Sequence, residues 1–263
     1  MLIIAVSLES AFAIDELLPY VSPELRARSS RLRRVDDVRR SLVGEIIVRM
    51  FAMDIEGQRN DEIAFEKGVF GKPRLQHMRE PWEYNISHSG KWVTGIVSRK
   101  NQRVGVDVQK MGAVKPSLSR YTMSPKELEH YLSLPLKAQR AYYYKLWTSK
   151  ESYLKMEGIG ISMPIRKVFT EGLTIQDETA CARNGRTVCY FKQYPVDAGY
   201  SLTAASTDYR FPDECLLVKS SDLLDVFMRR CREQSQSTVE DITRLHLTHS
   251  DELVIQSNGV PAV

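Results

Sequence analysis

One stretch near the middle of the chain reads Trp147-Thr148-Ser149-Lys150-Glu151-Ser152-Tyr153-Leu154-Lys155. Glu151 and Lys155 are four residues apart, so on a helix they lie on one face, one turn from each other. A carboxylate can bind a hard cation, and an ammonium group beside it can bind a phosphate. The stretch therefore predicts a helix that presents both groups to one ligand.

A second stretch, upstream, adds oxygen ligands. The residues Val104-Gly105-Val106-Asp107-Val108-Gln109 alternate, which is the pattern of a half-buried strand with the valines on one face. Asp107 and Gln109 then lie on the other face, together with Gly105, which permits close backbone approach. Magnesium usually takes one or two carboxylates and leaves its other positions to water and substrate phosphates. Asp107 and Glu151 match this coordination preference. From the residues alone, two acids on solvated faces remain an open alternative.

The composition bounds the class of protein. The chain has 263 residues, of which 43% are hydrophobic, enough for one large domain or two small ones. The formal net charge of +4 favours anionic partners without requiring nucleic acid,. No apolar run approaches the ~20 residues of a membrane helix, and the N-terminal apolar run has no basic residues before it. We expect a cytoplasmic protein with free thiols at Cys181, Cys189, Cys215 and Cys231,.

The order of the expected elements suggests two halves. Ser22-Pro23 and Ser124-Pro125 both read as a helix start with a capping serine,. Each follows a strand and precedes a long helix, so we expect an α+β fold with halves at 1–103 and 104–231 and a polar extension at 232–263. Further strands are predicted at 92–97, 168–170, 188–194 and 200–205. Helices are predicted at 126–132, 136–156 and 221–232, and loops at 71–73 and 85–90.

Positive side chains indicate an anion site in the first half. The stretch from Ser22 to Met53 is rich in arginine, and Arg28 has the planar group suited to bidentate phosphate contact. His88 lies in the short polar segment Asn85-Ile86-Ser87-His88-Ser89-Gly90, where it could donate to a phosphate,. A solvated arginine face and a structural histidine are the simpler alternatives.

Four stretches together resemble one enzyme family, the 4′-phosphopantetheinyl transferases of the Sfp type, which activate nonribosomal peptide synthetases. They are Gly71-Lys72-Pro73, the segment from Asn85 to Gly90, Gly105-Val106-Asp107-Val108 and the stretch from Trp147 to Lys155. The resemblance implies a pseudo-dimer of two similar α+β halves, with coenzyme A at their junction. It also implies transfer of the phosphopantetheine arm to a serine of an apo peptidyl or acyl carrier protein, which releases adenosine 3′,5′-bisphosphate. Magnesium is the implied metal, with manganese as the alternative.

The resemblance also assigns roles. Asp107, Gln109 and Glu151 would hold the metal, Lys155 would contact the diphosphate, and Glu151 would take the proton of the carrier serine. Arg28, Ser87 and His88 would contact the phosphates of the nucleotide, and Lys72 and Pro73 would line its adenine and ribose end. Glu127 matches an acid near the metal. The segment from Lys110 to Met123 is expected to dock the carrier protein, through Met111, Val114, Leu118 and Tyr121.

Two residues depart from the family pattern. Gln109 stands where these enzymes commonly have glutamate, and an amide oxygen is a weaker metal ligand. Leu25 stands where they have lysine. Two alternatives follow: a nucleic-acid-binding module, from the arginine-rich helix, and a carrier-binding protein without catalysis, from Gln109. With Asp107, Glu151 and Lys155 all present, we expect a catalytic monomer with no nucleic-acid or membrane partner.

Overall fold

The computed structural model describes residues 1–9, 11–67, 73–99, 102–159, 163–168, 179–184 and 187–233. It is an α+β fold, as the sequence predicted. The helices are α1 (Ile14–Leu17), α2 (Pro23–Ser29), α3 (Val35–Glu56), α4 (Pro116–Thr122), α5 (Pro125–Ser133), α6 (Leu136–Glu157) and α7 (Ser220–Glu233). The strands are β1 (Leu2–Ser7), β2 (Phe65–Lys67), β3 (Pro73–Leu75), β4 (Trp82–Ser89), β5 (Trp92–Arg99), β6 (Val104–Lys110), β7 (Thr179–Asn184), β8 (Thr187–Tyr194), β9 (Tyr200–Ser206) and β10 (Leu216–Lys219).

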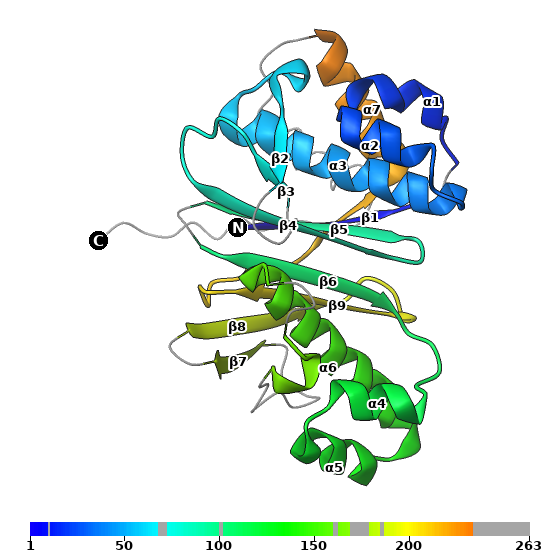
Figure 1. Ribbon diagram of the computed structural model, residues 1–263, viewed down its shortest axis with the longest axis vertical. Coiled ribbons are helices and arrows are strands. Elements are labelled where there is room, and N and C mark those ends of the chain that lie inside the picture. The colour runs from blue at the N-terminus through cyan, green and yellow to red at the C-terminus, as the bar shows by residue number, and fades with distance from the viewer. Residues whose placement is uncertain are drawn as a thin grey trace, which may run out of the picture.

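Two four-stranded sheets lie next to each other in the middle of the molecule, with helices on the outer side of each (Figure 1). Their strand orders are β10-β1-β5-β4 and β6-β9-β8-β7. One apolar cluster joins them, because alternate side chains of each sheet face the other. Its members include Ile3, Ile96, Val104, Val106 and Val108. Burial of this shared surface holds the two halves together.

The two halves share several features. Helices α3 and α6 have 22 residues each, and each ends at a glycine in the left-handed region, Gly57 at φ 66° and Gly158 at φ 68°,. The strands β1-β5-β4 and β6-β9-β8 have the same antiparallel pairing. These features are compatible with a pseudo-dimer, and a duplication of the chain stays a prediction.

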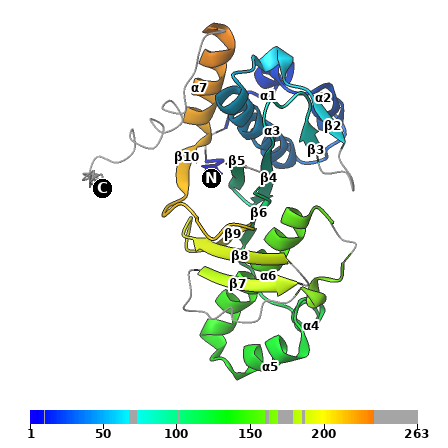
Figure 2. The same ribbon diagram turned by 90° about the vertical axis from the view of Figure 1, so that its left-hand side faces the viewer.

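The last described elements return to the first half. Strand β10 pairs in parallel with β1, with Ile4 opposite Leu216, and α7 packs its apolar residues, among them Leu223 and Phe227, into the core beneath α3. Figure 2 shows β10 and α7 leading away from the second sheet to the side of the first. The predicted boundaries placed 104–231 in one C-terminal half, whereas residues 216–233 belong to the first half. Short strand β10 was not predicted.

Several local predictions from the sequence are wrong. The segment from Asn85 to Ser89 is part of strand β4, not a loop, because its polar side chains bind the backbone of β6 instead of water. Strand β6 is buried on both faces from Val104 to Val108, because α6 covers the face that was expected to be half exposed. Val168 lies in a bend instead of the predicted strand, whose other residues are outside the described part of the chain.

The loop predicted at 71–73 is wrong at Pro73, which begins strand β3, and its other two residues are outside the described part of the chain. The remaining predicted elements are confirmed. They are the N-terminal strand, the helical arginine-rich stretch (α2 and α3), the strands at β5, β6, β8 and β9, and the helices at α5, α6 and α7. Cys189, Cys215 and Cys231 are free thiols, as expected. The side chain of Cys181 and the segment 234–263 are outside the described residues.

Candidate active site

Gly105 determines how closely helix α6 can approach strand β6. A Cβ atom at this position would lie 2.0 Å from the backbone oxygen of Ser152 and 2.6 Å from the backbone nitrogen of Met156. Only glycine fits there. On the same face of the sheet, the hydroxyl of Thr148 lies 2.7 Å from that of Thr203 on β9. The helix is therefore seated directly on the strand that carries Asp107.

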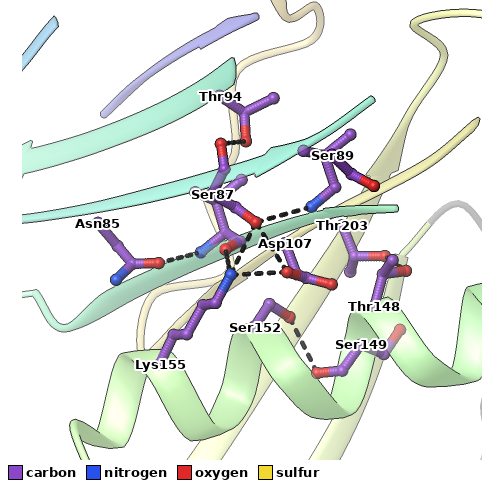
Figure 3. Close-up of polar contacts among 12 residues, drawn as sticks. Asn85, Ser87, Ser89, Thr94, Asp107, Thr148, Ser149, Ser152, Lys155 and Thr203 are labelled. Atoms are coloured by element: carbon purple, nitrogen blue, oxygen red, sulfur yellow. Dashed lines mark hydrogen bonds and ion pairs between the residues drawn. The ribbon is translucent and has the colours of Figure 1, made fainter. Parts of the chain in front are cut away.

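This contact brings Lys155 of α6 to Asp107 of β6 (Figure 3). The Lys155 Nζ donates to Asp107 Oδ1 at 2.6 Å and to the hydroxyl of Ser87 at 2.7 Å. The Ser87 hydroxyl donates to the same Asp107 oxygen at 2.8 Å. Asp107 is 5% exposed, so these charge-assisted bonds lie in a region of reduced dielectric, where they are strong. Two residues from two other elements thus donate to one carboxylate oxygen of Asp107.

The other carboxylate oxygen fits a cation. Asp107 Oδ2 is buried and has no hydrogen-bond partner among the described residues, which is costly unless another ligand binds it. Burial raises the pKa of Glu151, and the negative charge of Asp107 raises it further, while Lys155 opposes the shift. A divalent cation between the two carboxylates would relieve both the unsatisfied oxygen and the repulsion.

The described residues provide few other metal ligands. Among them, no group of three or more His, Cys, Asp or Glu side chains is placed to hold a metal ion. Gln109 follows Asp107 on the same face of β6, and it is partly buried. Two carboxylates and an amide oxygen are oxygen-only ligands, the set that suits magnesium or manganese.

A cavity of about 860 Å³ opens beside this cluster, lined by α2, α3, β2 and β4. Its described lining residues include three arginines, three glutamates and one histidine: Arg28, Arg31, Arg40, Glu24, Glu45, Glu66 and His88. Burial of the ring lowers the pKa of His88, and the charges of Arg40 and then Lys155 lower it further. The cavity thus presents charges of both signs, of which the guanidinium groups suit an anionic ligand, and His88 lies within electrostatic reach of Lys155.

Arg40 is already held in position at the edge of the cavity. Its guanidinium bonds to Asp37 and donates to the backbone oxygen of Gly90 at 2.8 Å. Arg31 and Arg40 belong to the arginine-rich stretch, but the sequence assigned neither of them to the site. Leu25 lines the cavity and packs into the core at 8% exposure, so the positive charge of the cavity comes from the neighbouring arginines.

The remaining predicted site residues have different placements. Lys72 lies outside the described residues, and of Pro73 the structure describes the backbone in β3. Glu127 Oε2 accepts from the backbone of Ser124 and from Lys150 Nζ, both at 2.7 Å. Lys150 is fully buried and also donates to the backbone oxygen of Thr122. These contacts indicate that Glu127 joins α5 to α6, and a role for it near a metal stays a prediction.

The helix of the opening stretch is fixed by its apolar residues. Leu154 is buried, and Trp147 packs between two apolar clusters of the second half. This packing holds Glu151 and Lys155 in a defined orientation. In the described part of the chain, no helix is long and apolar enough to cross a membrane.

Comparison with known proteins identifies the family. Residues 10–100 match the model for the N-terminal domain of 4′-phosphopantetheinyl transferase, and residues 103–205 match that of the 4′-phosphopantetheinyl transferase superfamily. The chain is 32% identical to the 4′-phosphopantetheinyl transferase psf-1 of Bacillus pumilus, over 73% of this chain and 82% of that protein. It is 29% identical to the 4′-phosphopantetheinyl transferase Sfp of Bacillus subtilis (strain 168), over 80% of this chain and 92% of that protein. The chain belongs to the 4′-phosphopantetheinyl transferase superfamily and is an enzyme of the Sfp type.

Proposed function

We propose that the cavity and the Asp107–Lys155 cluster form one site for coenzyme A and its metal. The observation that carries this proposal is the position of Lys155. It forms an ion pair with Asp107, and its charge also lowers the pKa of His88, which lines the cavity. The nucleotide would occupy the cavity, with Arg28 and His88 on its phosphates. Its diphosphate would then lie at Lys155. Lys72 and Pro73, at the adenine and ribose end, stay a prediction.

Asp107 and Glu151, with Gln109 beside them, would hold magnesium or manganese. The buried Asp107 Oδ2 and the raised pKa of Glu151 support this set. When bound, the metal supplies positive charge to the diphosphate as its phosphorus–oxygen bond breaks. Gln109 lacks the negative charge of a glutamate, so the protein contributes a charge of −2 to the metal through its two carboxylates.

The residues of the site account for the proton and the leaving group. The hydroxyl oxygen of the carrier serine attacks the phosphorus that bears the pantetheine arm, and adenosine 3′,5′-bisphosphate leaves. Glu151 takes the proton of that hydroxyl, and its raised pKa brings it nearer to the working pH of a general base,. The ammonium group of Lys155 offsets the negative charge that develops on the leaving phosphate.

The carrier protein is proposed to dock on the segment that contains α4. Of the four apolar residues expected there, Met111 and Val114 pack against the core of the second half. Leu118 is 39% exposed and Tyr121 is 55% exposed. Leu118→Ala should raise the KM for the carrier several-fold and leave the KM for coenzyme A unchanged. Tyr209→Ala, which also removes an exposed apolar side chain, is the matched control. Equal effects of the two variants would contradict this docking site.

The transfer itself is tested by mass spectrometry. The protein is incubated with coenzyme A, magnesium and an apo carrier protein, and the carrier should gain the mass of one phosphopantetheine group. Glu151→Gln should abolish the gain while coenzyme A still binds. No mass gain on several peptidyl and acyl carriers would refute the assignment. The choice of carrier, the monomeric state, the cytoplasmic location and the lack of a nucleic-acid partner stay predictions.

A further inference from the structure

Strand β4 directs its alternate side chains to two different places. Asn85, Ser87 and Ser89 face β6, where they accept the backbone N–H groups of Val106, Val108 and Lys110 at 3.0, 3.3 and 3.0 Å. Ile86 and His88 lie on the other face and line the cavity; Asn85, although it bonds to β6, is also among the residues that line it. Ser87 is not among the described residues that line it. Neighbours in sequence, Ser87 and His88 therefore point to opposite faces of the strand.

The hydroxyl of Ser87 has its full set of hydrogen bonds within the protein. A serine hydroxyl can donate once and accept twice. Ser87 donates to Asp107 Oδ1 and accepts from Lys155 Nζ and from the backbone of Val108. Ser87 is also buried, with 5% of its surface exposed. A phosphate oxygen would have to displace Asp107 as the acceptor of the single proton.

We propose that Ser87 is a positioning residue, and not a ligand of the nucleotide phosphates. It ties Lys155 to Asp107 Oδ1, so that Asp107 Oδ2 is turned toward the position of the metal. Through Val108 it also fixes β6, on which Asp107 lies, against β4. Figure 3 shows these contacts meeting at the hydroxyl oxygen of Ser87. The inference rests on the proposed function for its readout, and it replaces the phosphate contact that the family resemblance implied for Ser87.

Coenzyme A and its analogue without the 3′-phosphate separate the two roles. If Ser87 positions Lys155 and Asp107, Ser87→Ala should lower kcat/KM by about 10–100-fold, the usual effect of a residue that orients a metal ligand. Ser87→Ala should lower kcat/KM by the same factor when 3′-dephospho-coenzyme A is the substrate. His88→Ala is the comparison, because its loss should largely vanish with the analogue if His88 contacts that phosphate.

Metal binding gives a second readout that does not depend on turnover. Titration with Mn²⁺, followed by electron paramagnetic resonance, should show weaker binding to Ser87→Ala than to the unmodified protein. Ser89→Ala is the matched control, because the Ser89 hydroxyl also accepts from the backbone of β6, at Lys110, two residues beyond the bond that Ser87 makes. Its Mn²⁺ affinity should be unchanged.

Several outcomes would overturn the inference. They are a loss in Ser87→Ala that disappears with 3′-dephospho-coenzyme A, an unchanged Mn²⁺ affinity, or equal Mn²⁺ losses in Ser87→Ala and Ser89→Ala. If Ser87→Ala does not fold, Ser87→Cys, which nearly keeps the volume but bonds weakly, is measured in the same way. A failure of the unmodified protein to modify any carrier would refute the proposed function instead, and the Mn²⁺ titration would still decide the role of Ser87.

Discussion

Glu151 is a carboxylate that the fold places in an unfavourable position. Its pKa is raised, chiefly by burial and then by Asp107. The folded protein therefore keeps a proton at pH values where the unfolded chain has already lost it. The contribution of Glu151 to the free energy of unfolding therefore falls as the pH rises from the ordinary pKa of glutamate to the raised pKa of this side chain. In metal-free protein the ionised form of this carboxylate is thus destabilising.

Glu151→Gln should remove this charge while it abolishes transfer. Without metal, the variant should melt at a higher temperature than the unmodified protein at neutral pH, by about 2–4 °C for each kcal/mol relieved. At pH values below the ordinary glutamate range the two proteins should melt alike, because both side chains are then neutral. Thermal melts in a chelator across this range measure the difference. A lower melting temperature for the variant at neutral pH would contradict the argument.

The proposed metal site predicts that a substitution of Gln109 raises the metal affinity. Gln109→Glu adds a third negative oxygen ligand on the face of β6 that carries Asp107, so half-saturation by magnesium should occur at a several-fold lower concentration. Without metal the same variant should be less stable, because like charges are brought together. Metal titrations of transfer, with melts in a chelator, test both parts. An unchanged magnesium requirement would mean that residue 109 is not a metal ligand.

The residues of the site differ in how far the sequence could predict them. Asp107, Glu151 and Lys155 were predictable because helical and strand periodicity fix which side chains share a face. The bonds of Ser87 to Asp107 and Lys155 were not, because they join residues far apart in sequence. The polar face of β4 looked like a loop for the same reason: its partner is the edge of a strand in the other half.

At the scale of elements, the contact between α6 and β6 is the most sensitive feature. Gly105→Ala would place a methyl group 2.0 Å from a backbone oxygen of α6, so the helix has to move. We expect a loss of stability of about 3 kcal/mol or more. Transfer should fall by about 100-fold, because the helix carries Glu151 and Lys155 and a displacement of about 1 Å is enough. Urea unfolding and steady-state kinetics measure both effects.

Gly199→Ala is the matched control for this substitution. A methyl group at position 199 would have no atom within 4 Å beyond the residue itself and its two chain neighbours, so the variant should keep its stability and its activity. If Gly105→Ala were as harmless as Gly199→Ala, the close seating of α6 on β6 would be wrong.

Elements with a long, regular pattern were predicted well, and short elements were not. Helix α6 is long and has a glycine after its last residue, so its end was readable,. Strand β10 has four residues and pairs with β1, at the other end of the chain. Nothing local in Leu216–Lys219 specifies that partner, so only the complete fold reveals it.

At the scale of the whole molecule, residues 216–233 complete the core of the first half. A chain that ends at residue 213 lacks Leu216, Val218, Leu223 and Phe227, which are buried in that core. It also lacks the buried ion pair between Arg230 and Asp54, at 2.7 Å. We expect it to lose cooperative unfolding, because the removed apolar groups leave a large part of the first sheet and α3 uncovered.

A chain that ends at residue 233 keeps all of these contacts and is the matched control. It should unfold cooperatively, with a melting temperature close to that of the 263-residue chain. Circular dichroism melts of the two truncated proteins test the difference. A cooperative transition in the chain that ends at residue 213 would show that the first half is stable without β10 and α7.

The return of β10 to β1 has a consequence for the order in which the protein is made. A ribosome releases β1, α3, β4 and β5 first, but the sheet that they form has its outer edge open until β10 follows, which begins 117 residues after the end of β5 at Arg99 (216 − 99). By then the whole second half has emerged. Since β1 and β10 are non-local partners, their pairing closes a long loop and is slow. The first half therefore lacks one strand of its sheet while the second half is made. Both halves can complete their folding only after β10 has emerged.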